Sequence, residues 1–238
     1  MPSLRILANC IGLGADFSVL RDYYGFFRGQ IPPDPTGASV TLSLKRDLTL
    51  LEGQHFNANM IAVPVDQFTD ADDIEIDYSI LRLRNIYATV SVGVGRILHF
   101  GISASQAGEL ATPNDRDDLE ELTERFTVNN NGLDVFLIRN MNIPSDGGML
   151  LGRSAVNGSC DKNSKGLTGS CAGLFGSEQT SRTVAHEIGH YLSLEHKNSE
   201  RDNLMCQSGL ANSIRNSVQL TSTQGNDVVN HCFVEDRC

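Results

Sequence analysis

The sequence predicts an α+β domain, and two observations support this prediction. Apolar residues between 76 and 87 recur at spacings of three and four, which is typical of one face of an amphipathic helix. Segments 96–102 and 133–139 resemble strands and flank a second helical segment at 115–126. With 238 residues, of which 40% are hydrophobic, the chain can form a sizeable core in one large domain or two small ones.

The other expected elements are short or lie near the ends of the chain. We expect a helix at 180–192 and four short strands, at 4–11, 39–44, 59–65 and 149–151. Three acids, Asp70, Asp72 and Asp73, precede the first long helix, where negative charge suits the helix dipole. Thr221 and Gln224 have the spacing of a capping box, which predicts the start of a last helix.

Charge and hydropathy exclude two classes of partner. The chain has 19 Lys and Arg against 29 Asp and Glu, so its formal net charge is −10. Negative charge of this size disfavours binding to the phosphate backbone of nucleic acids. No segment approaches the length of apolar chain that a membrane-spanning helix needs. We therefore expect no nucleic acid or membrane partner, and the sequence indicates nothing about oligomeric state.

Cysteine usage favours an oxidising compartment. The even number of cysteines is compatible with three bridges: Cys10, Cys160, Cys171, Cys206, Cys232 and Cys238. None of them forms a Cys-x-x-Cys pair, which disfavours a thiolate zinc site and favours disulfides. Cys160 and Cys171 lie in one irregular loop rich in Gly, Ser and Asn, so a bridge between them would close a short excursion.

The first residues superficially resemble a signal peptide. However, Asn9 interrupts the apolar run, and Asp16 follows it without a cleavage pattern of small residues. We therefore expect residue 1 to begin an expressed or mature form of a secreted protein from which the export signal is missing.

Residues 186–196 carry the most informative pattern, His-Glu-Ile-Gly-His-Tyr-Leu-Ser-Leu-Glu-His. On a helix, His186 and His190 lie about 40° apart and one turn along the axis, so both imidazoles can bind one metal ion. Glu187 lies beside them, close to a water that such an ion would hold. A random chain of this composition would contain only roughly 0.007 His-Glu-x-x-His patterns, so the spacing indicates a zinc site.

His196 can share that ion only if the helix ends early. In a continuous helix, His196 would lie about 9 Å along the axis from His190. We therefore expect the helix to end near Leu192 and the chain to turn back at Ser193. A left-handed residue with a Cβ costs about 1–2 kcal/mol, whereas zinc binding in structural sites contributes about 10–16 kcal/mol. The serine is therefore compatible with the turn.

These residues resemble the long zinc motif of the metzincin metallopeptidases, with Ser193 at the position of that family's glycine. Asp202–Cys206 is similar to the methionine turn beneath the metal site of the family, so the resemblance places Met205 there. Gln207 stands where some metzincins have a tyrosine, and an additional phenol ligand or oxyanion donor is therefore not implied.

The resemblance also implies an architecture. It implies a twisted mixed β-sheet with a backing helix and an active-site helix, then a small irregular C-terminal subdomain with a terminal helix. The metalloprotease domain would span residues 51–238, with an upper subdomain at about 51–192 and a lower subdomain at about 193–238. Residues 1–50 form an N-terminal segment whose role stays open, including whether it contains a pro-segment.

In such a lower subdomain the last helix packs near the chain that leaves the active site. The resemblance therefore suggests a Cys206–Cys232 bridge between the methionine turn and that helix. Cys238 would then pair with Cys10 or stay free.

For function, the resemblance implies a secreted zinc-dependent endopeptidase that acts on protein or peptide substrates. One Zn²⁺ held by His186, His190 and His196 would activate a water, with Glu187 as general base. Nothing in the sequence indicates a structural Ca²⁺. Two alternatives stay open. In one, a carboxylate such as Glu200 replaces His196 as third ligand, and in the other the chain is a catalytically idle binding domain that zinc stabilises.

Overall fold

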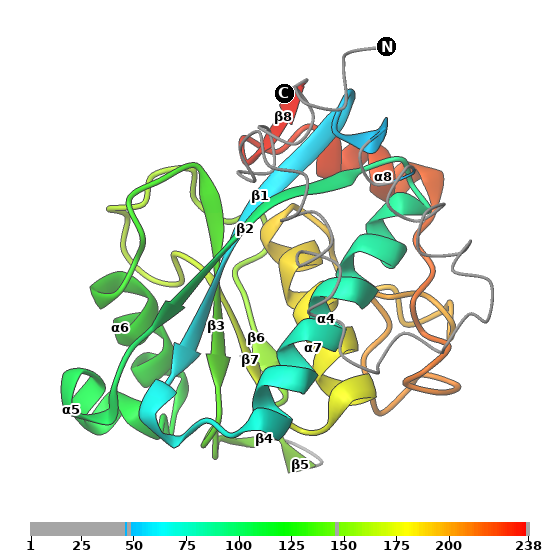
Figure 1. Ribbon diagram of the computed structural model, residues 1–238. Helices are drawn as coiled ribbons and strands as arrows, with labels where there is room; N and C mark the ends of the chain where they lie inside the picture. The colour runs from blue at the N-terminus through cyan, green and yellow to red at the C-terminus, as the bar shows by residue number, and fades with distance from the viewer. Residues whose placement is uncertain (1–45, 47–48, 146–147, 237–238) are drawn as a thin grey trace.

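The computed structural model describes residues 46, 49–145 and 148–236. Within them, a twisted mixed sheet has helices on both faces (Figure 1), which confirms the predicted α+β class. The strands expected at 4–11 and 39–44, together with Cys10 and Cys238, lie outside the described residues.

The main sheet has the strand order β2-β1-β3-β7-β6, and β8 pairs with β1. Its strands are β1 (Gln54–Val63), β2 (Gly93–Gly101), β3 (Gly132–Ile138), β6 (Gly152–Arg153), β7 (Ser170–Gly173) and β8 (Val234–Asp236). Neighbouring strands from β2 to β7 run parallel, whereas β6 and β8 are antiparallel to their partners. The strand expected at 149–151 is instead β5 (Gly148–Met149), which pairs with β4 (Pro144–Ser145) outside this sheet.

Within the described residues, the helices are η1 (Val65–Gln67), α4 (Asp70–Ala88), α5 (Ala104–Ala107), η2 (Gly108–Ala111), α6 (Arg116–Arg125), α7 (Ser177–Tyr191) and α8 (Ser222–Val229). The four expected helices are present in the expected order as α4, α6, α7 and α8, and the short helices η1, α5 and η2 were not expected. The predicted capping box begins α8, because Gln224 N–H donates to Thr221 Oγ1 and Thr221 N–H donates to Gln224 Oε1. No helix in the described ranges combines the length and apolar character needed to cross a lipid bilayer.

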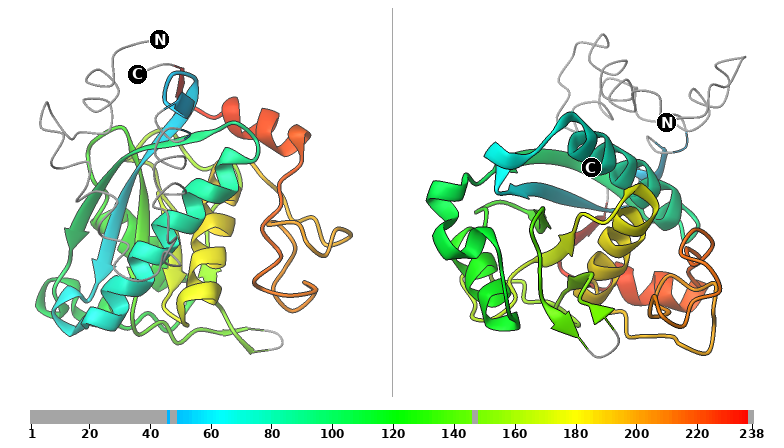
Figure 2. Two further views of the ribbon diagram at one scale, coloured as in Figure 1. Left: turned by 45° about the vertical axis from the view of Figure 1, so that its right-hand side comes forward. Right: turned by 90° about the horizontal axis from the view of Figure 1, so that it is seen from below.

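Two hydrophobic cores lie on opposite faces of the sheet. Because side chains alternate along a strand, β3 supplies Leu133, Val135 and Leu137 to one core and Phe136 and Ile138 to the other. The first core lies beneath α4 and α7, and the second beneath α5, η2 and α6 (Figure 2). A strand buried on both faces is expected where a parallel sheet is covered by helices on each side.

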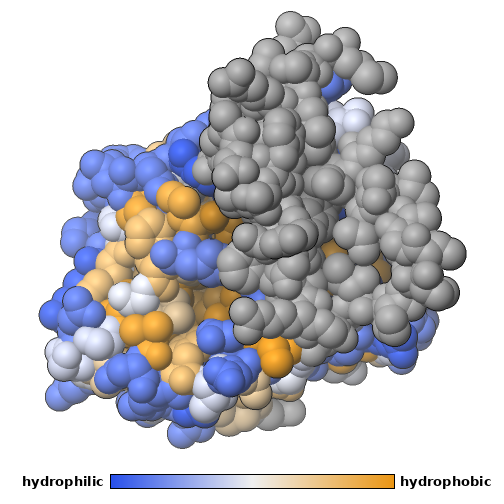
Figure 3. All heavy atoms as spheres, viewed as in Figure 1, coloured by the Kyte–Doolittle hydropathy of each residue, from blue (hydrophilic) through white to orange (hydrophobic). Residues whose placement is uncertain are grey.

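The outer strand β2 is less covered than the centre of the sheet. It is buried at its start and exposed over its last residues. Apolar side chains gather on this side of the molecule (Figure 3), and Val65 and Phe100 are among the exposed large hydrophobic residues of the described chain.

The helix α4 fixes the position of α7. The Tyr87 hydroxyl donates to the Ala185 carbonyl (3.1 Å), and the Glu75 carboxylate accepts from Gly176 N–H (2.9 Å) and from the Thr180 hydroxyl. These contacts hold the first turn of α7 and the residue directly before His186. These contacts with α4 therefore position α7, the helix that carries the zinc motif, without any contribution from a metal ion.

The loop between β6 and β7 is held by a buried ion pair and a disulfide. Lys162 Nζ lies 2.8 Å from Asp134 Oδ2, and Asn59 Nδ2 donates to the other carboxylate oxygen of Asp134 (2.7 Å). Burial lowers the pKa of Lys162, and the Asp134 carboxylate opposes this effect. The bridge joins Cys160 to Cys232, two residues 72 positions apart.

This bridge shows that both expected pairings, Cys160–Cys171 and Cys206–Cys232, are wrong. Cys171 lies on β7 with its side chain in the core beneath α6, away from the loop that carries Cys160. Burial raises the pKa of the Cys171 thiol, so it stays protonated. Cys206 is buried and free, and the helix α8 ends at Val229, so Cys232 lies beyond it in a turn beside Cys160.

Replacing both Cys160 and Cys232 by serine should lower the free energy of unfolding by about 2–4 kcal/mol, because the bridge closes a long loop of the unfolded chain. Denaturant titration of the double variant against the native protein measures this loss. Peptide mapping without reductant should recover a Cys160–Cys232 peptide, with Cys171 and Cys206 as free thiols. A peptide linking Cys160 to Cys171 would contradict the structure.

Candidate metal centre

The helix α7 presents His186 and His190 from adjacent turns, and both side chains are buried. His186 Nδ1 lies 2.7 Å from the Leu204 carbonyl oxygen, and His190 Nδ1 lies 2.6 Å from that of Leu194. A carbonyl oxygen only accepts, so Nδ1 of each ring carries the proton. Each Nε2 then has a free lone pair, as a metal ligand requires.

The chain reverses directly after α7, as the sequence predicts. Ser193 has φ 81°, in the left-handed region. Leu194 N–H donates to the Gly189 carbonyl (2.8 Å) and Ser193 N–H donates to that of His190 (3.0 Å). This pair of hydrogen bonds is the Schellman motif that ends many helices. The reversal returns the chain over α7 and brings His196 back beside His190.

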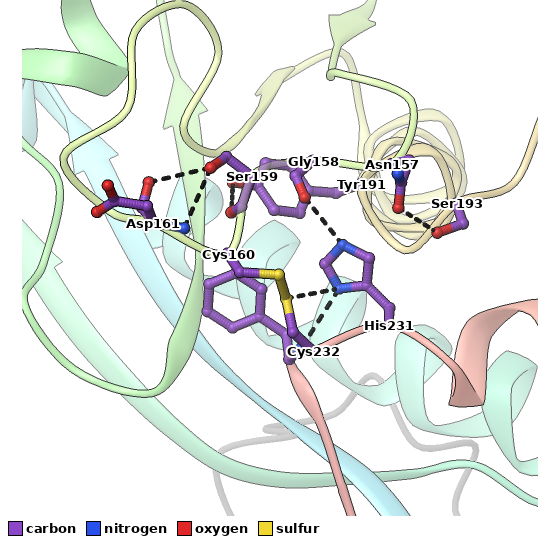
Figure 4. The surroundings of a disulfide bond; sticks show 10 residues. Asn157, Gly158, Ser159, Cys160, Asp161, Tyr191, Ser193, His231 and Cys232 are labelled. Carbon is purple, nitrogen blue, oxygen red and sulfur yellow. Dashed lines mark hydrogen bonds between the residues drawn. A yellow bond between two sulfur atoms is a disulfide. The ribbon is translucent and has the colours of Figure 1, made fainter.

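A second segment supports this reversal. Asn157 N–H donates to the His190 carbonyl (3.0 Å), and Gly158 N–H donates to that of Tyr191 (2.8 Å). The Ser193 hydroxyl donates to Asn157 Oδ1 (2.8 Å; Figure 4), so the serine that replaces glycine has a specific polar partner. A Cβ on Gly158 would lie 2.3 Å from the Tyr191 ring, so only glycine permits this close approach. The sequence alone does not indicate this contact, because the segments are far apart in the chain.

Three imidazoles converge at the reversal. Ligand nitrogens of His186, His190 and His196 all lie within 4.8 Å of one another, and Nε2 of His190 is 3.1 Å from Nε2 of His196. Zn–N bonds of about 2.0–2.1 Å in tetrahedral geometry place ligand nitrogens about 3.3 Å apart. The distance between Nε2 of His190 and Nε2 of His196 is close to this value, and the three donors lie near enough together to hold a zinc ion.

The protonation states also fit a metal. Burial, with His190 nearby, lowers the pKa of His186 well below its usual value. Burial lowers the pKa of His190 to about 4, and it also lowers the pKa of His196. Neutral imidazoles are the form that binds a metal ion, and these rings are neutral at pH 7.

Glu187 is buried beside this cluster. Burial raises the pKa of Glu187 to about 8, and the charges of Arg182 and Arg153 oppose this effect. A cation held by the three imidazoles would further favour the carboxylate form. The strand β6 passes close by, since a Cβ on Gly152 would lie 2.7 Å from Glu187 Cγ.

Met205 lies in a tight turn directly against α7. Its side chain is fully buried, and a Cβ on Gly189 would lie 2.8 Å from Met205 Sδ, so this glycine makes room for the thioether. Asn203 Oδ1 accepts from Met205 N–H (2.9 Å), and the side-chain amides of Asn203 and Gln224 exchange two hydrogen bonds. The turn is thereby joined to α8. Gln207 accepts from Asn198 and offers no phenol to the site.

The structure favours His196 over Glu200 as the third ligand. Glu200 Oε1 lies 2.9 Å from Lys197 Nζ, and Asn203 Nδ2 donates to its other oxygen (3.2 Å). Both oxygens of Glu200 therefore have partners outside the imidazole cluster.

A second group of donors, Cys160, His231 and Cys232, is close enough to hold a metal ion. However, the two sulfur atoms are bonded to each other, and His231 Nε2 donates to the Gly158 carbonyl (3.0 Å; Figure 4). The group therefore has a structural role: the disulfide and the His231 hydrogen bond hold the segment 157–160, which supports the chain reversal at Ser193.

A metal-dependent peptidase is the class of protein that this arrangement defines, because it joins neutral imidazoles, a buried carboxylate and an adjacent edge strand. Comparison with known families makes the class specific. Residues 79–197, half of the chain, match the model of the Metallo-peptidase family M12B Reprolysin-like. The chain belongs to this family and is a zinc metallopeptidase, and the family implies Zn²⁺ as its cofactor.

Solved structures similar to this chain include three peptidases. Archaemetzincin from Methanopyrus kandleri has a TM-score of 0.49 and 12% identity, over 74% of this chain and 95% of that one. Metalloproteinase-II from Bacteroides fragilis has a TM-score of 0.49 and 13% identity, and the alignment covers 75% of this chain and 53% of that one. A zinc-dependent peptidase from Methanocorpusculum labreanum has a TM-score of 0.43 and 10% identity, and the alignment covers 72% of this chain and 99% of that one. No curated protein sequence gives a significant match.

The purified protein should bind about one equivalent of zinc per chain. The three imidazoles provide the protein ligands of one tetrahedral zinc ion, and the fourth position is open for water. His196→Ala should weaken zinc binding by more than the roughly 10- to 100-fold that follows loss of an outer-shell partner. Chelator competition measures the affinity, with His99→Ala and Glu200→Gln as controls. Unchanged affinity in His196→Ala would exclude this ligand, and weakened affinity in Glu200→Gln would favour the carboxylate alternative.

Ser193→Gly should leave the free energy of unfolding close to that of the native protein. Removing the Cβ relieves about 1–2 kcal/mol of strain, and losing the hydrogen bond to Asn157 costs about 0.5–1.5 kcal/mol. Ser193→Val should destabilise by about 2 kcal/mol or more, because it keeps the strain, adds a β-branch and loses the bond. Denaturant titration compares the two variants. A neutral valine variant would show that the reversal does not depend on this residue.

Proposed function

We propose that this chain is a secreted zinc endopeptidase of the metzincin type. The observation that carries the proposal is the convergence of His186, His190 and His196 beside the buried carboxylate of Glu187. The disulfide on an exposed loop supports an extracellular location, because such bridges persist in oxidising compartments.

The chemistry divides between the cofactor and the chain. When bound, Zn²⁺ lowers the pKa of water towards 7 and polarises the scissile carbonyl. Glu187 removes a proton from the attacking water as the new C–O bond forms. It then delivers that proton to the leaving amine as the C–N bond breaks. The buried site keeps bulk water away from the carboxylate, so the proton stays available for the amine.

An extended substrate fits the edge of the sheet. The strand β6 ends the described part of the sheet, and its backbone pairs there only with β7. A peptide that pairs with the free edge of β6 is bound through its backbone. Because Gly152 of β6 lies against Glu187, such a peptide runs beside the carboxylate. Backbone pairing requires neither terminus of the substrate, and this favours an endopeptidase.

A catalytically idle zinc-binding domain is the alternative of a different class. It needs the three imidazoles but has no use for a buried carboxylate beside them. Burying Glu187 is costly, because the charged form loses its hydration. The presence of a buried Glu187 beside the imidazoles therefore favours the enzyme.

Glu187→Gln should bind zinc with nearly native affinity and lose about 10²- to 10⁴-fold in turnover, the usual contribution of a positioned acid–base group. Casein is a suitable unstructured substrate. Its cleavage by the native protein should stop on addition of a zinc chelator and return with zinc. Glu195→Gln, at the exposed acid beside His196, is the matched control and should keep activity. Zinc binding without cleavage by the native protein would favour the idle domain.

A further inference from the structure

Arg182 lies on α7 one turn before His186 and is 3% exposed. Its guanidinium donates to three backbone carbonyls of the chain after the reversal. Nη2 lies 3.3 Å from Leu204 O, Nε lies 3.3 Å from Ser217 O, and a further bond joins Nη2 to Cys206 O. Among the described residues, no carboxylate lies within ion-pair distance of it. A buried cation that contacts only carbonyls needs an explanation.

One of these carbonyls also belongs to the metal centre. Leu204 O accepts from Arg182 and from His186 Nδ1, which is 2.7 Å away. Leu204 directly precedes Met205, and Cys206 directly follows it. Arg182 therefore binds the turn on both sides of the methionine, and it binds the oxygen that orients the first imidazole.

The shape of the side chain suits this task. Arginine presents several N–H donors in a rigid planar fork, whereas lysine presents a single point charge. A fork can bind carbonyls of two separate segments at once, here the methionine turn and Ser217. An apolar side chain would leave these buried oxygens with fewer donors. The turn could then shift, and the Leu204 carbonyl would shift with it.

We propose that Arg182 is a positioning residue of the metal centre, which fixes the Leu204 carbonyl and through it the orientation of the His186 ring and the position of Met205. This inference rests on the proposed function only in taking His186 as a metal ligand. It assigns Arg182 no contact with substrate.

Two variants test the proposal. Arg182→Met removes the charge and the fork, and Arg182→Lys keeps the charge without the fork. Arg182→Met should bind zinc about 10- to 100-fold more weakly, as expected when a partner of a metal ligand is lost. The visible absorption spectrum of the cobalt-loaded variant should change, because the ligand field at the ion depends on the orientation of His186. In the zinc-loaded variants, kcat should decrease by a larger factor than the factor by which KM changes. Arg182→Lys should lie between Arg182→Met and the native protein in zinc affinity.

The matched control is Arg201→Met. Arg201 is exposed and donates to the Leu210 carbonyl (2.8 Å), so the same substitution removes an arginine–carbonyl bond away from the metal. Its zinc affinity and cobalt spectrum should equal those of the native protein.

A folded Arg182→Met protein that melts at a lower temperature but keeps native zinc affinity and cobalt spectrum would overturn the proposal, leaving Arg182 a stabilising residue only. If Arg182→Met does not fold, native affinity and spectrum in Arg182→Lys overturn it equally. Failure of the proposed function can be told apart from failure of the Arg182 proposal. In the first case the native protein itself does not bind zinc or does not cleave casein, whereas in the second only the Arg182 variants depart from expectation.

Discussion

The return of the chain after α7 is the constraint on which the centre depends. Three imidazoles can share an ion only if the helix stops within a few residues of His190, and the backbone at Ser193 must then enter the left-handed region. Helix ends leave carbonyls without partners, and here the neighbouring segment at Asn157 and Gly158 satisfies two of them. Hydrogen bonds from this segment thereby offset the backbone strain at Ser193. The segment is itself held in place by the disulfide between Cys160 and Cys232.

The imidazoles are oriented by the backbone. The carbonyls of Leu194 and Leu204 each accept from one ring, and both belong to segments that follow the helix. Carbonyls select the tautomer with a free Nε2 and add no full negative charge to a buried site. Inside the protein, the charges of Arg182 and Arg153 act on the buried carboxyl of Glu187. The three imidazoles are neutral, so they would leave the positive charge of a bound ion available to polarise a substrate carbonyl.

Local features were predictable, whereas contacts between distant segments were not. The spacing of His186, Glu187 and His190 predicts a helix face, and the geometric requirement on His196 predicts the reversal. The strand β7 and the supports at Asn157 and Arg182 escaped prediction. The strand is only four residues long in a Gly-rich segment, and the supports act on residues more than twenty positions away. Cysteine pairing failed for the same reason, since it depends on where a loop and a turn meet in space.

The pairing of β8 with β1 has a consequence for the order of synthesis. Residues 234–236 hydrogen-bond to residues 54–56, so the last described strand completes the first. A chain that leaves the ribosome from its N-terminus exposes the His-Glu-x-x-His segment before this strand and before Cys232 exist outside the tunnel. Pairings so distant in sequence also form slowly, because a long loop must close first. The nascent chain therefore carries the zinc motif before residues 234–236 are available to pair with β1, and before Cys232 is available to bond to Cys160.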